Sequence, residues 1–146
     1  MLCNILLDKL PQSTPNNYKI KTSYKQGIKF ELLMQDNELS KEEQVELALN
    51  LFYYKKDLKE IHTEQELQTR IEDIIWFYKC GKEEKTSQNN ENKREKQIYS
   101  YVFDADKIYS AFIQQYNIDL QKTNLHWWQF RSTLATSPDE PQIDEI

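Results

Sequence analysis

The sequence predicts a mainly α protein, with about five helices in a compact domain, a short N-terminal β-hairpin or extended arm, and a disordered polar linker. Apolar side chains recur at helical spacing through most of the chain. The chain has only two glycines in 146 residues, which disfavours tight-turned β folds and glycine-rich phosphate loops. Because only 38% of the residues are hydrophobic, the core must be small.

The first expected element is the extended arm. Residues 10–17 contain two prolines among serine, threonine and asparagine neighbours, and residues 18–21 alternate apolar and polar side chains. This pattern is typical of a short hairpin or an extended segment. Strands of this length must pack on other elements to be stable.

Capping residues mark the start of three helices. Thr22 suits the N-cap of a first helix that runs to about Asp36. Ser40 and Thr63 are each followed three residues later by glutamate, which is the capping-box pattern, and the helix after Thr63 should end at the Cys80-Gly81 pair. We expect the first two helices to form an antiparallel hairpin with Leu32, Met34 and Leu47 among their apolar side chains.

The chain then changes composition. Residues 82–97 are almost entirely polar and charged, so they cannot bury enough apolar area to offset the entropy of ordering, and we expect a mobile insertion. A short extended segment should follow at 98–103. The predicted organisation is a single helical domain over residues 1–136, followed by an acidic, flexible tail at 137–146.

Two more helices complete the expected domain. Asp104 can cap a fourth helix whose apolar face runs from Ile108 to Tyr116, and Asn117 suits a left-handed C-cap. A fifth helix is expected after Thr123.

Residues 125–131, Leu-His-Trp-Trp-Gln-Phe-Arg, concentrate large aromatic side chains, which must lie against a core or a partner. In a helix Trp128 is in register with Leu125 and should face the core, whereas Trp127 and Phe130 fall on adjoining faces. No single helical face can hide them all. The candidate partner-binding residues are Trp76, Trp127, Phe130 and Arg131.

The sequence offers no pattern for catalysis. His62 and His126 lack a zinc-binding spacing, and Cys3 and Cys80 supply no partner pattern for one. No nucleophile stands beside a glycine-rich oxyanion loop. We therefore expect no enzyme, no cofactor and no metal.

Charge and hydropathy argue against two classes of partner, nucleic acids and membranes. The net charge of −5 argues against nucleic acid as the main partner. No apolar run has the length of a membrane span or a signal peptide. We expect a reduced, cytosolic protein that does not bind membranes.

Six short blocks of sequence stand in a distinctive order. They are residues 29–33 (KFELL), 46–52 (ELALNLF), 76–82 (WFYKCGK), 103–112 (FDADKIYSAF), 116–120 (YNIDL) and 125–131 (LHWWQFR). Together they resemble a family of small proteins from long-tailed phages and prophages of Gram-positive bacteria. The resemblance covers residues 6–134, and its last block is the most specific.

The resemblance implies a binding role. Members of that family are usually encoded between the major tail protein and the tape-measure protein, and they are taken to act as tail assembly chaperones. The implied activity is to coat the helix-rich tape measure so that it stays soluble while tail-tube subunits polymerise around it. The implied partners are the tape-measure protein, with the tail-tube protein and further copies of the chain as additional candidates. The implied location is the cytoplasm of the bacterial host, with the protein absent from the finished virion.

The chain departs from the family after Leu134. A further helix with an apolar stripe is expected there, whereas residues 137–141 read Ser-Pro-Asp-Glu-Pro. Either the chain is a truncated member or an acidic tail replaces the helix. The family offers no catalytic residues to transfer.

Two alternatives from other functional classes stay open. A small phage-encoded inhibitor or modulator of a host or defence protein would also be acidic, helical and non-enzymatic, and its gene would lie outside the tail cluster. A small hydrolase would need polar residues such as Asp104, Asp106 and His126 to converge in a pocket.

Overall fold

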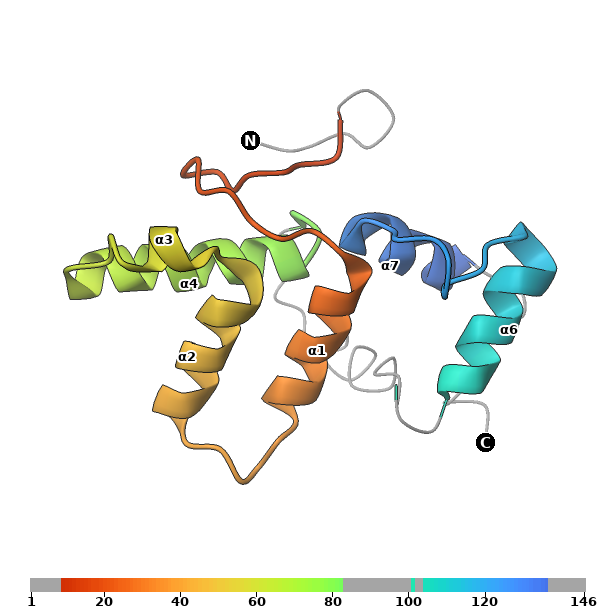
Figure 1. Ribbon diagram of the computed structural model, residues 1–146, viewed down its shortest axis with the longest axis horizontal. Helices are drawn as coiled ribbons and strands as arrows, with labels where there is room; N and C mark the ends of the chain where they lie inside the picture. Colours follow the sequence, from red (N-terminus) through yellow and green to blue (C-terminus); the bar gives the residue numbers. More distant parts are fainter. Residues whose placement is uncertain (1–8, 83–100, 102–103, 137–146) are drawn as a thin grey trace. The chain divides into compact units, whose positions relative to one another are not determined.

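The computed structural model describes residues 9–82, 101 and 104–136, which form helices joined by turns (Figure 1). In these ranges there are six helices and no strand, so the mainly α prediction is confirmed. The described residues fall into two compact units, a division that the sequence analysis did not predict. The first unit contains residues 9–82 and 126–128, and the second contains 101, 104–125 and 129–136.

Several predicted segments lie outside the described residues. They are most of the insertion at 82–97, most of the extended segment at 98–103, and the tail at 137–146. None of the helices within the described ranges is long and apolar enough to cross a membrane.

The first unit opens with a helical hairpin, as predicted. Helix α1 (Tyr24–Met34) begins after Ser23, one residue later than expected, and the Ser23 hydroxyl accepts a hydrogen bond from the Lys25 amide. Helix α2 (Lys41–Phe52) begins with the predicted capping box, in which Ser40 and Glu43 exchange side-chain and backbone hydrogen bonds. The two helices lie side by side, joined by a loop (Figure 1).

Two further helices follow in the same unit. The short α3 (Lys55–Leu58) was not predicted, because four residues carry too little periodicity to show in a sequence. Helix α4 (Glu64–Tyr78) has the predicted Thr63 N-cap. The chain leaves α4 through two left-handed residues, Cys80 (φ 60°) and Gly81 (φ 72°), as the sequence indicated.

The N-terminal arm lies on α4. It doubles back through Asn17 (φ 66°), and within the described residues it forms only an isolated bridge between Ser13 and Lys19 instead of paired strands. The Asn16 amide donates to both oxygens of the buried Asp73 carboxylate at 2.9 and 3.1 Å. Beside it, the buried Arg70 guanidinium stacks on the Tyr18 ring at 3.5 Å from its centroid.

Aromatic rings form the core of the first unit. Phe52 packs on Phe30 of α1 at 5.6 Å between ring centroids and on Phe77 of α4 at 5.9 Å. Phe52 and Phe77 are fully buried. Each such side chain contributes about 1.5–3 kcal/mol through burial of apolar area, so these contacts hold α1, α2 and α4 together.

The second unit is built on α6 (Ala105–Tyr116) and most of α7 (Trp127–Thr136). Phe112 of α6 stacks on Phe130 of α7 at 5.2 Å between ring centroids. Asn117 adopts the predicted left-handed conformation at the end of α6, with φ 55°. Asp104 occupies the predicted N-cap position without a side-chain hydrogen bond to the helix.

Candidate functional site

The two adjacent tryptophans secure the C-terminal end of α4. The indole N–H of Trp127 donates to the Tyr78 carbonyl at 3.0 Å, and that of Trp128 donates to the Phe77 carbonyl at 2.8 Å. Carbonyl groups at the end of a helix lack partners within the helix. The tryptophans therefore satisfy these acceptors and bury their rings against the same turn.

Both glycines of the chain lie beside these rings. A Cβ atom on Gly27 would lie 2.1 Å from Cε3 of Trp127, and one on Gly81 would lie 2.9 Å from Cη2 of Trp128. A side chain at either position would therefore collide with an indole. The scarcity of glycine predicts the fold class from sequence but does not predict this pairing, because residues 27 and 127 are remote in sequence.

His126 has a structural position. Its Nε2 atom lies 2.8 Å from the Pro11 carbonyl oxygen, and its Nδ1 atom accepts the Trp128 amide at 3.0 Å. This arrangement requires a neutral ring, with the proton on Nε2 donated to Pro11. Burial lowers the pKa of His126, which also favours the neutral ring.

The expected exposure of two candidate binding residues is wrong. Trp127 and Phe130 are both 0% exposed, so neither presents a surface to a partner. The expectation assumed one helix with one core, whereas Trp127 belongs to the first unit and Phe130 to the second. Trp128 is 4% exposed, which confirms its predicted core position.

The other two candidates are partly exposed. Trp76 packs against Trp128 at 5.4 Å between ring centroids and keeps part of its surface accessible. Arg131 is likewise half-buried, on the α7 segment that belongs to the second unit. Of the four candidates, Trp76 and Trp127 belong to the first unit, and Phe130 and Arg131 belong to the second.

Exposed apolar side chains stand instead on the α1–α2 hairpin. Met34 is 52% exposed, Leu47 47% and Leu32 37%. Helical periodicity predicts that these residues lie on apolar helix faces, but it cannot show which part of such a face another element covers. We call these three residues the hairpin surface.

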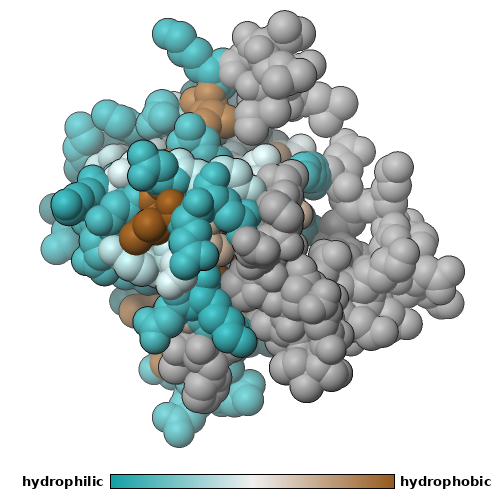
Figure 2. All heavy atoms as spheres, turned by 90° about the vertical axis from the view of Figure 1, so that its right-hand side faces the viewer, coloured by the Kyte–Doolittle hydropathy of each residue, from teal (hydrophilic) through white to brown (hydrophobic). Residues whose placement is uncertain are grey.

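Isolated exposed apolar residues occur on most proteins and need no explanation. Figure 2 shows one face of this molecule, on which the described residues are mainly hydrophilic and the hydrophobic ones are few. Ile75 on α4 and Ile113 on α6 are exposed singly in this way. The hairpin surface differs because it collects three such residues on two adjoining helices, with Leu32 and Met34 on different sides of α1.

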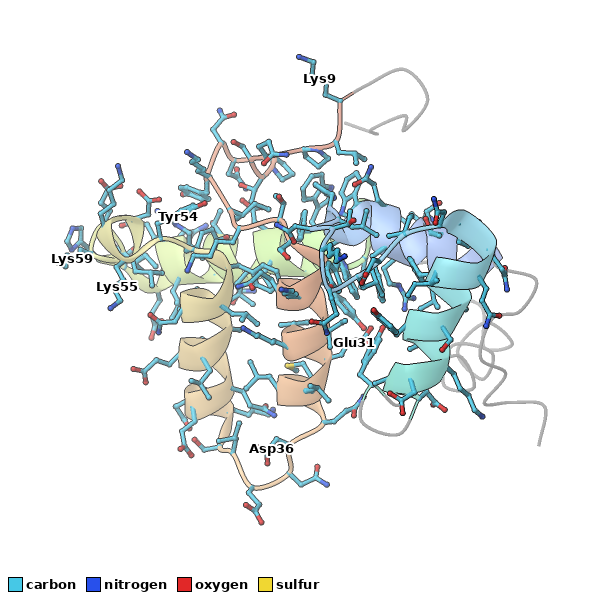
Figure 3. All side chains as sticks on the ribbon, turned by 45° about the vertical axis from the view of Figure 1, so that its right-hand side comes forward. Lys9, Glu31, Asp36, Tyr54, Lys55 and Lys59 are labelled. Carbon is cyan, nitrogen blue, oxygen red and sulfur yellow. The ribbon has the colours of Figure 1, made fainter. Side chains whose placement is uncertain are left out.

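Acidic side chains border the hairpin surface. Asp36 lies in the loop that joins the two helices, where Figure 3 shows it at the end of the hairpin. The exposed carboxylates of the loop and of α2 are Asp36, Glu38, Glu42, Glu43 and Glu46. A surface with exposed apolar residues and an acidic border suits a helix that carries an apolar stripe flanked by basic residues.

The described residues contain no group of three or more histidine, cysteine or acidic side chains that could hold a metal ion. The hairpin surface itself contains only apolar side chains. The exposed apolar and acidic side chains of the hairpin suit binding through apolar and charge contacts.

Comparison with known proteins adds one finding. A family model described as Bacteriophage Gp15 protein matches residues 6–146. The match continues past Leu134, where the sequence analysis expected a departure from the family. No curated protein and no solved structure matches the chain.

Proposed function

Because the chain belongs to the Bacteriophage Gp15 protein family, we propose that it is a tail assembly chaperone that binds the tape-measure protein. Family membership supports a role in phage structure or morphogenesis. The narrower role is supported by the six sequence blocks, which resemble proteins encoded beside the tape measure. We further propose that it acts in the host cytoplasm, is absent from the finished virion, and binds rather than catalyses.

The hairpin surface is the observation that carries this proposal. A tape-measure helix could pack its apolar stripe on Leu47 together with either Leu32 or Met34, which point to different sides of α1, while basic side chains beside the stripe approach the acidic border. Burial of the exposed part of each side chain contributes about 1 kcal/mol. Such contacts give weak, reversible binding, which a chaperone needs if polymerising tail-tube subunits are to displace it.

Co-expression with the tape-measure protein tests the proposal. We expect the wild-type chain to raise the soluble fraction of the tape measure and to co-purify with it. The variant Leu32→Lys/Met34→Lys/Leu47→Lys should lose both effects, because charged side chains would replace the apolar contacts.

The matched control is Ile75→Lys/Ile113→Lys, which changes exposed apolar residues outside the hairpin. This control should behave as wild type. Failure of the wild-type chain to associate with the tape measure would contradict the proposal. Equal losses in both variants would show that the hairpin surface is not the contact.

A further inference from the structure

A group of lysines surrounds an exposed tyrosine in the first unit. The ammonium groups of Lys19 and Lys21 lie 5.7 and 5.4 Å from the centroid of the Tyr54 ring, which is 37% exposed. Lys55 follows Tyr54 directly and Lys59 lies one helical turn further on, at the same end of the unit (Figure 3). We call Lys19, Lys21, Tyr54, Lys55 and Lys59 the basic surface.

Negative charge gathers on the loop before α2 and on the first half of that helix. The acidic side chains there are Asp36, Glu38, Glu42 and Glu46. All four are exposed, and we call them the acidic surface. Lys41 is the one cation between residues 36 and 46. Figure 3 shows Asp36 and Tyr54 at opposite ends of this part of the unit.

The two surfaces are too far apart to neutralise each other. The 12 residues of α2 span about 18 Å at 1.5 Å per residue, and Glu46, halfway along the helix, lies about 9 Å from its C-terminal end. The Debye length at physiological salt is about 8 Å, so attraction across this distance is largely screened. Within the described part of the chain, the lysines of the basic surface and the carboxylates of the acidic surface form no ion pairs.

Neighbouring acids weaken the basic surface without cancelling it. Asp57, Glu60 and Glu64 are the carboxylates nearest to it along the chain. With Lys56 included, five lysines stand against these three carboxylates. This excess of positive charge is local, because the chain as a whole has a net charge of −5.

The dipole of α2 accounts for only part of this pattern. Acidic side chains in the first turn of a helix are favoured by the positive N-terminal end, and Glu42 stands there. The effect fades beyond the first turn, so it does not explain Glu46, and it cannot explain Lys19, which belongs to the arm.

We infer that the basic surface of one copy of this chain binds the acidic surface of a second copy. The complementary charges bring the surfaces together, and Tyr54 supplies an exposed aromatic ring of the kind enriched at interface centres. The contact joins unlike surfaces: a head-to-tail arrangement leaves one surface of each kind open to further copies, whereas a two-fold arrangement uses both surfaces of each copy in a dimer. This inference goes beyond the proposed function, since it concerns the purified chain without any tape measure.

Sedimentation of the purified chain tests whether it self-associates through charge. At about 50 mM salt we expect the weight-average mass to rise with protein concentration above that of one chain, and at about 500 mM salt to return to it, because salt screens exposed charges. A single-chain mass at low salt across the concentration range overturns the inference. Association that strengthens with salt also overturns it, because apolar contacts would then be responsible.

Charge reversal tests which surfaces meet. Lys19→Glu/Lys55→Glu/Lys59→Glu reverses the basic surface, and Glu38→Lys/Glu42→Lys/Glu46→Lys reverses the acidic surface. Each variant alone should lose self-association, because both of its surfaces then carry the same sign. An equimolar mixture should regain it, because every surface of one variant is complementary to a surface of the other.

The control Lys29→Glu/Lys107→Glu/Lys122→Glu has the same net charge as the first variant and alters lysines outside both surfaces. It should associate as wild type does. Recovery in the mixture also shows that both variants are folded. A mixture that stays at the mass of one chain, or a control that loses association equally, contradicts the contact between unlike surfaces.

Discussion

At the scale of single residues, His126 links the N-terminal arm to α7. Its neutral ring donates to the Pro11 carbonyl and accepts the amide of Trp128. A protonated ring could no longer accept that amide, and its charge would be buried near the positive N-terminal end of a helix. Protonation of His126 should therefore destabilise the first unit.

The stability of the first unit should fall as the pH drops below about 6.5, the ordinary pKa of histidine. Burial lowers the pKa of His126 in the folded chain, so the unfolded chain takes up the proton first. The stabilisation is complete above pH 6.5 and is lost as the pH falls towards the lowered folded-state pKa. Urea unfolding between pH 5 and 8 measures this.

His126→Asn should remove most of that pH dependence, because asparagine does not titrate in this range. His62→Asn should keep it, since His62 is exposed. An unchanged pH dependence in His126→Asn would show that other groups cause the loss in acid.

Gly27 presents a second test at this scale. Alanine normally favours a helix interior by about 1 kcal/mol over glycine. Here a Cβ would lie 2.1 Å from Cε3 of the buried Trp127 ring, and overpacking of this kind costs about 1–3 kcal/mol or more. We expect Gly27→Ala to lower the free energy of unfolding in urea titrations.

Trp127→Phe removes Cε3 and Cζ3 of the indole, two of the three ring atoms that a Cβ on residue 27 would meet. The loss caused by Gly27→Ala should therefore be smaller when Trp127→Phe is also present, giving a coupling energy in a double-mutant cycle. Additive effects of the two substitutions, or a stabilising Gly27→Ala, would contradict the close packing.

At the scale of elements, the sequence predicts helix ends better than helix surroundings. Caps at Ser40, Thr63 and Asn117 were predictable because their hydrogen bonds join residues within a few positions of one another. The burial of Trp127 was not predictable, because it depends on Gly27, a hundred positions away. The exposure of Leu47 likewise depends on what α2 packs against.

The capping box of α2 should have a measurable energy. Ser40→Ala removes the hydroxyl that accepts the Glu43 amide and should cost about 1 kcal/mol in the free energy of unfolding. Ser110→Ala, at an exposed position inside α6, should cost nothing. Equal unfolding midpoints for wild type and Ser40→Ala would show that the capping box contributes nothing to stability.

At the scale of the whole molecule, one short segment contributes to two units. Residues 126–128 belong to the first unit and 129–136 to the second, so a fragment ending before 126 would lack the tryptophans that close α4. The sequence predicts a single domain, because periodicity along a helix cannot show that its residues belong to different cores. The expected exposure of Trp127 and Phe130 was wrong for this reason, since a high aromatic content does not show which rings are buried.

The central claim is that the hairpin surface contacts the tape-measure protein. A photo-reactive amino acid in place of Leu47, in chain co-expressed with the tape measure, tests this contact most directly. We predict a cross-linked product at position 47 and none at the control position 113, which is also exposed. Cross-linking at position 113 without any at position 47 would contradict the claim, as would no product at either position.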